Sequence, residues 1–278
     1  MQKNNAFLIA ICIATLSYAE ETTVKVSYEQ FNFTHSKKKD KGKRAGLHIT
    51  HKEDKNLYEF KYEKTDTDTF KPPLQKDLKV DKYYFKYTYQ LDTKQAFSLN
   101  YITIQDNIMK ETDGGAVYGL GYHYDNFDIK QYITDYKHFN VYQSDLHYSI
   151  KETYGAWKFH AKFLGKYIHL QNAKSNNFSK NAKKDYYTLG VKLHTHYEDY
   201  HFGVGAFFGK RLFAVLNNGF KVQHHAMEFN KSYMCGLGKH YSWGEINLKY
   251  VYQEATEIPI DNKHVKVKNI IFSLGYHF

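Results

Sequence analysis

Cysteine and proline are scarce in this chain. Its 278 residues include two cysteines and three prolines. Cys12 lies in a segment that we expect to be removed, so Cys235 would be left without a partner for an intrachain disulfide. The prolines, at positions 72, 73 and 259, fall between the stretches that favour strands, as expected because proline cannot donate to a strand ladder. The fold must therefore depend on burial of apolar surface or on contact with lipid.

Long apolar runs are also missing. The longest, residues 6–16 (AFLIAICIATL), is too short for a transmembrane helix. Lys3 precedes it, and small residues follow at Ser17 and Ala19, the two positions that signal peptidase reads. We predict a cleaved secretory signal peptide over residues 1–19 and an exported domain over residues 20–278. An N-terminal anchor helix is the alternative.

Aromatic and basic residues are abundant by contrast. The chain holds 27 Tyr and 20 Phe, and its formal net charge is +10. Tyrosine suits strands and membrane interfaces. A basic excess favours nucleic acid, anionic lipid or anionic solutes as partners. The predicted export argues against nucleic acid.

Alternation of apolar and polar residues recurs in runs of about ten residues, the length with which a tilted strand crosses a bilayer. The clearest runs are residues 82–91, 157–167, 187–197 and 245–253. Weaker runs lie near 22–34, 45–53, 57–65, 95–106, 115–125, 127–135, 140–151, 200–211, 225–238 and 265–278. We predict an all-β fold, a closed antiparallel transmembrane β-barrel of about fourteen strands, with 12–16 as the range.

The connections between these runs alternate in length, which is typical of outer-membrane barrels. Short turns are expected near residues 54–56, 92–94, 125–126, 151–153, 198–199 and 239–240, and long polar loops at 35–44, 65–79, 107–114, 171–185, 216–225 and 256–264. The link near 136–139 is a short exception. Aromatic residues beside the short turns predict an interfacial girdle: Tyr89, Tyr124, Phe127, Tyr154, Trp157, Tyr197, Tyr200, Tyr241, Trp243 and Phe278.

The last ten residues, NIIFSLGYHF, form a strand with one apolar face. That face consists of Ile270, Phe272, Leu274, Tyr276 and Phe278. A terminal Phe preceded by alternating apolar residues resembles the C-terminal signature of bacterial outer-membrane β-barrel proteins of the porin-like kind. The resemblance implies recognition by the barrel assembly machinery and residence in the outer membrane of a Gram-negative bacterium, in contact with lipid and lipopolysaccharide. A soluble β protein with its apolar faces inward is the rival architecture, but it leaves the terminal Phe and the loop rhythm unexplained.

If the apolar faces meet lipid, the polar faces line the lumen. The predicted pore-lining residues are Lys82, Lys86, Lys158, His160, Lys162, Lys166, Lys192, His194, His196 and Lys249, within a wider basic set that includes Lys25, Lys61, Lys130 and Arg211. This excess of positive charge predicts a mild preference for anions. Inward bulk at Tyr84, Tyr132, Leu164 and Phe207 could instead plug the bore.

Signals for chemistry are weak. His194 and His196 share a strand face and His201 follows the next turn, but sixteen histidines make such pairs common by chance, so we predict no metal and no cofactor. Ser144, Asp145 and His147 are close in sequence, but Ser144 would face lipid while the other two face the lumen. We therefore do not predict an enzyme.

Two functions remain. The favoured one is a passive, porin-like channel for small hydrophilic solutes. The alternative is a structural or adhesive barrel that acts through its long loops while its lumen is closed. The sequence does not indicate an oligomeric state.

Overall fold

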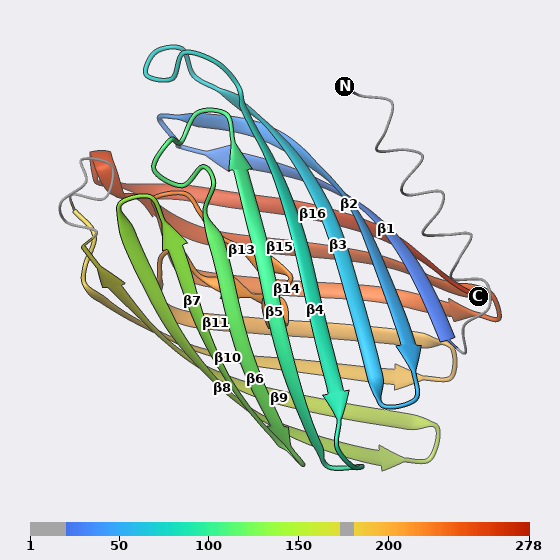
Figure 1. Cartoon of the computed structure of the whole chain (residues 1–278). Coiled ribbons are helices and arrows are strands. Elements are labelled where there is room, and N and C mark those ends of the chain that lie inside the picture. Colours follow the sequence, from blue (N-terminus) through green and yellow to red (C-terminus); the bar gives the residue numbers. More distant parts are fainter. Residues whose placement is uncertain (1–20, 173–180) are drawn as a thin grey trace, which may run out of the picture.

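The computed structural model describes residues 21–172 and 181–278. These residues form a closed barrel of fourteen antiparallel strands (Figure 1), so the predicted architecture is confirmed. The wall comprises β1 (Glu21–Thr34), β2 (Lys39–Glu53), β3 (Asn56–Thr69), β4 (Leu78–Gln90), β5 (Gln95–Asp106), β6 (Ala116–Tyr124), β7 (Phe127–Tyr136), β8 (Phe139–Tyr154), β9 (Trp157–Gln171), β10 (Asp185–Tyr197), β11 (Tyr200–Arg211), β14 (Met227–Tyr241), β15 (Gly244–Glu257) and β16 (Asn262–His277). The predicted signal peptide over residues 1–19 lies outside the described residues.

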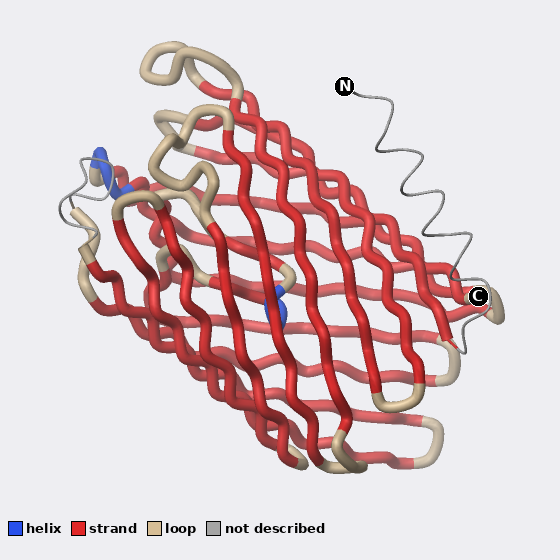
Figure 2. The backbone as a smooth tube through the Cα atoms, viewed as in Figure 1, coloured by secondary structure: helices blue, strands red, loops and turns tan. Residues whose placement is uncertain are grey.

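The tube view shows how completely strands dominate this wall (Figure 2). Neighbours in sequence pair along the whole wall, and β1 closes the ring against β16, with Tyr28 opposite Phe272 and Val24 opposite Tyr276. The described part of the chain contains no helix with the length and apolar character needed to cross a membrane. Its helical segments are short 3₁₀ turns, such as η5 (Ile258–Ile260).

The two faces of the wall differ as the alternation predicts. On β4, Tyr83 and Phe85 are exposed on the outside, whereas Lys82 and Tyr84 are buried inside. The residues of the C-terminal signature follow the same rule, because Ile270, Phe272, Tyr276 and Phe278 are exposed and Leu274 is partly exposed. A face of exposed aliphatic and aromatic side chains around a closed wall suits lipid rather than water.

The two ends of the barrel also differ. One end, here called the short-turn end, carries the connections at residues 54–55, 91–94, 125–126, 155–156, 198–199 and 242–243 together with the two strand termini at Glu21 and His277. Positive φ angles at Asp54 and Asp125 let two of these turns reverse within two residues. All ten aromatic residues predicted beside the short turns are exposed. The opposite end, the long-loop end, carries the remaining connections, including the short link at 137–138.

Some predicted boundaries were wrong. The turn expected at 151–153 lies at 155–156, because β8 continues to Tyr154, and the turn expected near 239–240 lies at 242–243. The loops expected at 35–44 and 65–79 shrink to 35–38 and 70–77. Charged residues had suggested loop, but a strand whose inner face lines a polar lumen accommodates them: Arg44 on β2 lies 2.6 Å from Glu29 on β1.

Candidate functional site

The segment between β11 and β14 folds into the barrel. We call residues 212–226 the inserted loop. It contains β12 (Val215–Leu216), η4 (Asn217–Gly219) and β13 (Lys221–Val222), and β12 and β13 pair as a two-stranded sheet. The sequence correctly predicted a loop at 216–225 but not its direction, since it turns inward. Figure 2 shows η4 in blue at mid-height of the barrel, consistent with a hydrogen bond from Lys61 on β3 to the Phe220 carbonyl.

The tip of the inserted loop depends on residues that tolerate a left-handed backbone. Asn217, Asn218 and Gly219 have φ angles of 51°, 57° and 98°. Asparagine and glycine adopt this region at the lowest cost. A Cβ atom on Gly219 would also collide with the side chain of Asn100 on β5. Glycine therefore lets the tip lie directly against the wall.

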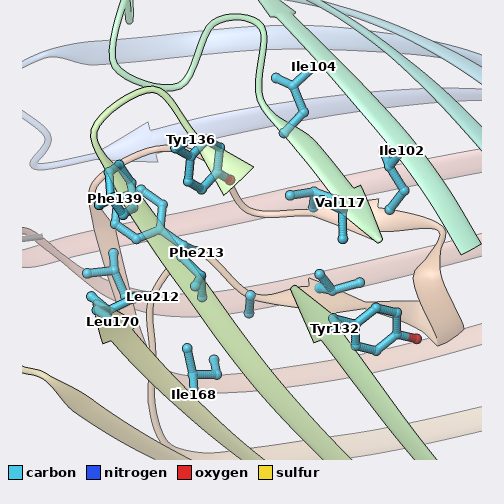
Figure 3. Close-up of a cluster of buried hydrophobic side chains, with 14 of the residues drawn as sticks. Ile102, Ile104, Val117, Tyr132, Tyr136, Phe139, Ile168, Leu170, Leu212 and Phe213 are labelled. Carbon is cyan, nitrogen blue, oxygen red and sulfur yellow. The ribbon is translucent and has the colours of Figure 1, made fainter. Parts of the chain in front are cut away.

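The first part of the inserted loop is packed like a protein core. Leu212, Phe213 and Val215 are at most 1% exposed. The Phe213 ring lies 5.0 Å from the ring of Phe139 and 5.7 Å from that of Tyr136, measured between centroids. Figure 3 shows these rings beside inward side chains of β5 to β9, including Ile102, Ile104, Val117, Tyr132, Ile168 and Leu170. At the long-loop end, this side of the lumen is filled.

Side chains of the wall also bind the backbone of the inserted loop. Gln143 accepts a hydrogen bond of 2.8 Å from the Val215 N–H and donates one of 2.8 Å to the Val215 carbonyl. Lys166 donates to the same carbonyl at 3.0 Å, and Lys82 donates to the Val222 carbonyl at 2.9 Å. Buried backbone groups need such partners, because an unpaired one costs about 1–3 kcal/mol. These contacts hold the loop in place.

The end of the inserted loop is held by a polar cluster. His224 Nε2 and His225 Nε2 lie 3.1 and 3.3 Å from Asp106 Oδ2, and His225 Nδ1 lies 2.7 Å from Lys39 Nζ. Burial lowers the pKa of His225 to about 4 and that of His224 well below its usual range. Burial disfavours the charged imidazolium. We call His224, His225, Asp106 and Lys39 the histidine latch.

An ion-pair network lies on the inner faces of β1 to β4. Arg44 bridges Glu29, at 2.6 Å, and Glu63, at 3.2 Å. Lys61 is 2.8 Å from Glu63, and Lys221 of the inserted loop is 3.6 Å from Glu29. Each carboxylate here has at least two cationic partners, so the network leaves no unpaired negative charge on this part of the wall.

A cavity of about 310 Å³ lies on the other side of the inserted loop, between it and strands β8 to β15. The charged side chains of its lining are five basic groups and one carboxylate: Lys162, Lys166, Lys192, Arg211, Lys221 and Asp145. Arg211 Nη2 donates to Ser232 Oγ, while its buried Nε and Nη1 have no partner among the described residues. Lys192 and Arg211 both lie near the Phe207 ring, at 5.7 and 5.9 Å from its centroid. The arrangement can accept an anionic group.

The predicted pore-lining residues do not share one role. Lys82 and Lys166 bind the inserted loop, as described above. Lys86 pairs with Glu59 at 2.6 Å and Lys162 with Asp128 at 3.2 Å. Lys192 and Lys249 have no ion pair among the described residues. Four others lie toward the short-turn end of β9 and β10: Lys158, His160, His194 and His196.

The predicted plugging residues face inward. Tyr84 and Tyr132 belong to the apolar cluster around the inserted loop, and Leu164 and Phe207 line the cavity. Sequence reasoning missed Gln143 and the inserted loop itself. The one local signal was the Asn-Asn-Gly tip, which indicates a tight turn but not its direction. Ser144 hydrogen-bonds Gln131, while Asp145 and His147 are buried inside, so these three do not converge.

No protein-family model and no curated protein match this sequence. Solved structures match its fold. The outer membrane protein Omp33 of Acinetobacter baumannii aligns with a TM-score of 0.51 and 8% identity over 93% of this chain and 99% of its own. The toluene transporter TodX of P. putida aligns with a TM-score of 0.51 and 10% identity over 95% of this chain and 92% of its own. A bacterial polysaccharide outer membrane secretin aligns with a TM-score of 0.58 and 7% identity over 92% of this chain and 98% of its own. At such identities the likeness is one of fold.

Proposed function

We propose that this protein is an outer-membrane channel for small hydrophilic solutes, narrowed by its inserted loop and mildly selective for anions. The observation that carries the proposal is the basic cavity beside that loop. Fourteen strands enclose more space than side chains alone fill in an eight-stranded barrel. The inserted loop occupies one side of this space, and the solute path follows the other.

Residence in the outer membrane of a Gram-negative bacterium is part of the proposal. Support comes from the exposed apolar band, the aromatic residues at the short-turn end, and the fold shared with Omp33 and the secretin. Contact with lipopolysaccharide, assembly by the barrel machinery through the last strand and removal of residues 1–19 belong to the same proposal. Recovery of the protein in the outer-membrane fraction without those residues would support it, and recovery from the soluble fraction would contradict it.

Selectivity is attributed to two groups rather than to the whole set of lysines. Most lumen lysines have a carboxylate or a loop carbonyl as partner, so their fields are partly cancelled. Lys192 and Arg211 retain unpaired charge beside the cavity and attract anions by Coulomb interaction. The solutes are those that pass the gap between the inserted loop and strands β8 to β15. The mechanism is size exclusion plus this field, without bond chemistry.

The test is single-channel conductance of the folded protein in a planar bilayer under a salt gradient. We expect small, steady current steps and a reversal potential whose sign is that of an anion-selective pore. A cation preference would contradict the selectivity, and a folded barrel that never conducts would contradict the channel.

A closed, adhesive or structural barrel is the second candidate. The dense packing of Leu212, Phe213 and Val215 favours it, because such packing is typical of a permanently filled interior. In that case the long loops would carry the function, and the absence of conductance would be accompanied by binding to a surface.

A further inference from the structure

Four histidines gather on the lumen wall at the short-turn end. They are His194 and His196 of β10, His201 of β11 and His240 of β14. Their ring centroids are 4.5 Å apart for His194 and His196, 5.4 Å for His196 and His201, and 4.8 Å for His201 and His240. We call these four residues the histidine cluster. No ion pair in the described chain involves any of them.

The register of three strands produces the histidine cluster. The two-residue turn at 198–199 places His196 directly opposite His201. The N–H of His240 donates to the Asp199 carbonyl at 2.8 Å, which brings β14 to the same level. Because side chains alternate along each strand, all four imidazoles point to the lumen rather than to the outer face.

Glycines provide the room that the rings occupy. A Cβ atom on Gly238, opposite His201, would collide with the His201 ring and with Asn247. A Cβ on Gly203, opposite His194, would lie 3.3 Å from His194 Cδ2, closer than side chains normally pack. Larger residues at these two positions would push the imidazoles apart.

The ring nitrogens are close enough to share an ion. His194 Nε2 and His201 Nδ1 share a hydrogen bond of 3.1 Å. This separation is near the roughly 3.3 Å between two nitrogens that bind one tetrahedral Zn²⁺ at 2.0–2.1 Å, so an ion would replace the shared proton. His194, His196 and His201 each offer a nitrogen within 4.8 Å of the other two, and His201, His240 and Glu245 form a second such set. His201 Nε2 is buried without a hydrogen-bond partner in the described chain.

We propose that the histidine cluster binds a divalent transition-metal ion of the Zn²⁺ class at the short-turn mouth of the lumen. His194, His196 and His201 would supply three neutral imidazole ligands, and the ring of His240 lies next to that of His201, at 4.8 Å between centroids. Imidazole-rich sites suit zinc, copper and nickel rather than magnesium or calcium. Glu245 is held by Lys25 at 2.6 Å, so it contributes negative charge nearby without being required as a ligand.

A second group with metal-binding residue types, Asp106, His224 and His225, is less suited. His225 Nδ1 already contacts the Lys39 ammonium group at 2.7 Å, and both imidazoles hydrogen-bond Asp106. A cation on this set would have to displace Lys39 and would disturb the attachment of the inserted loop. We therefore assign these residues to the latch and the metal to the cluster.

The proposal rests on the geometry of the wall and is independent of solute passage. The test is calorimetric titration of the full, folded barrel in detergent with ZnCl₂. We expect about one ion per chain, and a loss of affinity of roughly tenfold or more in the double variant His194→Ala/His201→Ala. The matched control is His123→Ala, another lumen histidine near a short turn, which pairs with Asp128 at 3.0 Å on β6 and β7, separated from β10 by β8 and β9.

The double variant His224→Ala/His225→Ala separates the two candidate positions. Zinc binding retained in this variant and lost in the cluster variant supports the proposal. Loss only in the latch variant overturns it, as does an absence of zinc binding by the wild type.

A measurement without variants covers the case in which a substituted barrel does not fold. Wild-type protein is treated with diethyl pyrocarbonate with and without Zn²⁺, and modified peptides are quantified by mass spectrometry. We expect zinc to protect the peptides that carry His194, His196 and His201 and to leave His123 unchanged. Equal modification of the cluster in both conditions overturns the proposal.

Discussion

The two sides of the lumen are built from strands with the same alternation, but one side is filled with packed side chains and the other is open. On β5 to β7, inward positions near the long-loop end carry Ile102, Val117 and Tyr132, all at most 2% exposed against the inserted loop. Across the lumen, inward positions of β10 and β11 carry Lys192 and Arg211, which line an open cavity. Alternation thus determines where the wall runs, whereas the identity of the inward residues determines whether that part of the lumen is filled or wet.

Removing the inserted loop should erase this contrast and gives the largest expected effect. Replacing residues 213–225 with a short Gly-Ser link should raise single-channel conductance several-fold, because the packed side would become aqueous. Shortening the outer loop at 70–77 serves as the control and should leave conductance unchanged. Equal conductance with and without the inserted loop would mean that the loop does not limit the path.

Loosening the loop without removing it should give an intermediate effect. Gln143→Leu removes the partner of the buried Val215 N–H and leaves the Val215 carbonyl with Lys166 alone, which should weaken docking of the loop by about 1–3 kcal/mol. We expect frequent transitions to a higher conductance level in single-channel records, in a barrel that still migrates as folded in unheated electrophoresis. Gln131→Leu is a matched control, because Gln131 hydrogen-bonds the outward-facing Ser144 instead of the loop. Quiet records from the Gln143 variant would contradict this prediction.

Removing the positive charges beside the cavity should change ion selectivity more than conductance. In Lys192→Gln and Arg211→Gln, we expect the ratio of chloride to potassium permeability to fall by roughly a factor of two, because each removes a charge beside the cavity. The reversal potential under a salt gradient measures this ratio. Lys231→Gln provides the control, since Lys231 is exposed on the outer face. A shift of the same size in the control would contradict a local origin.

Acidification should give the smallest effect, through the histidine latch. His225 has a pKa of about 4 when docked, below the usual value of 6.5, so the released loop binds more protons between these values. Docking should therefore weaken as pH falls from 6.5 toward 4 and change little above 6.5. Burial is the largest cause of the lowered pKa of His225. Lys39 and Lys82 lower this pKa further, and Asp106 raises it without reversing the direction.

Conductance recorded at about pH 5 and at neutral pH tests this dependence. We expect more open events at the lower pH in the wild type and a weaker dependence in His225→Gln, whose amide does not titrate. An identical pH response in the variant would assign the effect to other groups.

The wall could be predicted from the sequence because the alternation within each strand indicates which side chains face outward and which face the lumen. Tyr83 and Phe85 against Lys82 and Tyr84 indicate one strand without reference to any other. The inserted loop could not be predicted in this way, because its position depends on contacts with distant residues. Gln143 is 72 residues from Val215, and Asp106 is 118 residues from His224. A polar segment such as LNNGFKVQHH has the composition of an outer loop, and only the apolar patch inside the barrel makes the inward position favourable.

The histidine cluster is only partly visible in the sequence, for the same reason at shorter range. His194 and His196 are visible as a pair on one strand, and the turn at 198–199 suggests that His201 is near. His240 joins them only because β11 pairs with β14 across the whole inserted loop. The length of that loop does not determine the register between β11 and β14. The spacing of His240 from the other histidines in the sequence therefore does not indicate that they are neighbours.

The contact between β1 and β16 has a consequence for the order of folding. Thr23 Oγ1 and His277 Nδ1 meet at 2.9 Å across a separation of 254 residues. Joining two points so far apart along a free chain costs about 5 kcal/mol of loop-closure entropy. Hairpins between neighbours cost less, so they form first and leave an open sheet with two unpaired edges. Such edges recruit other chains in water. The last hydrogen-bonded ladder to form is thus the one that protects all the others from aggregation.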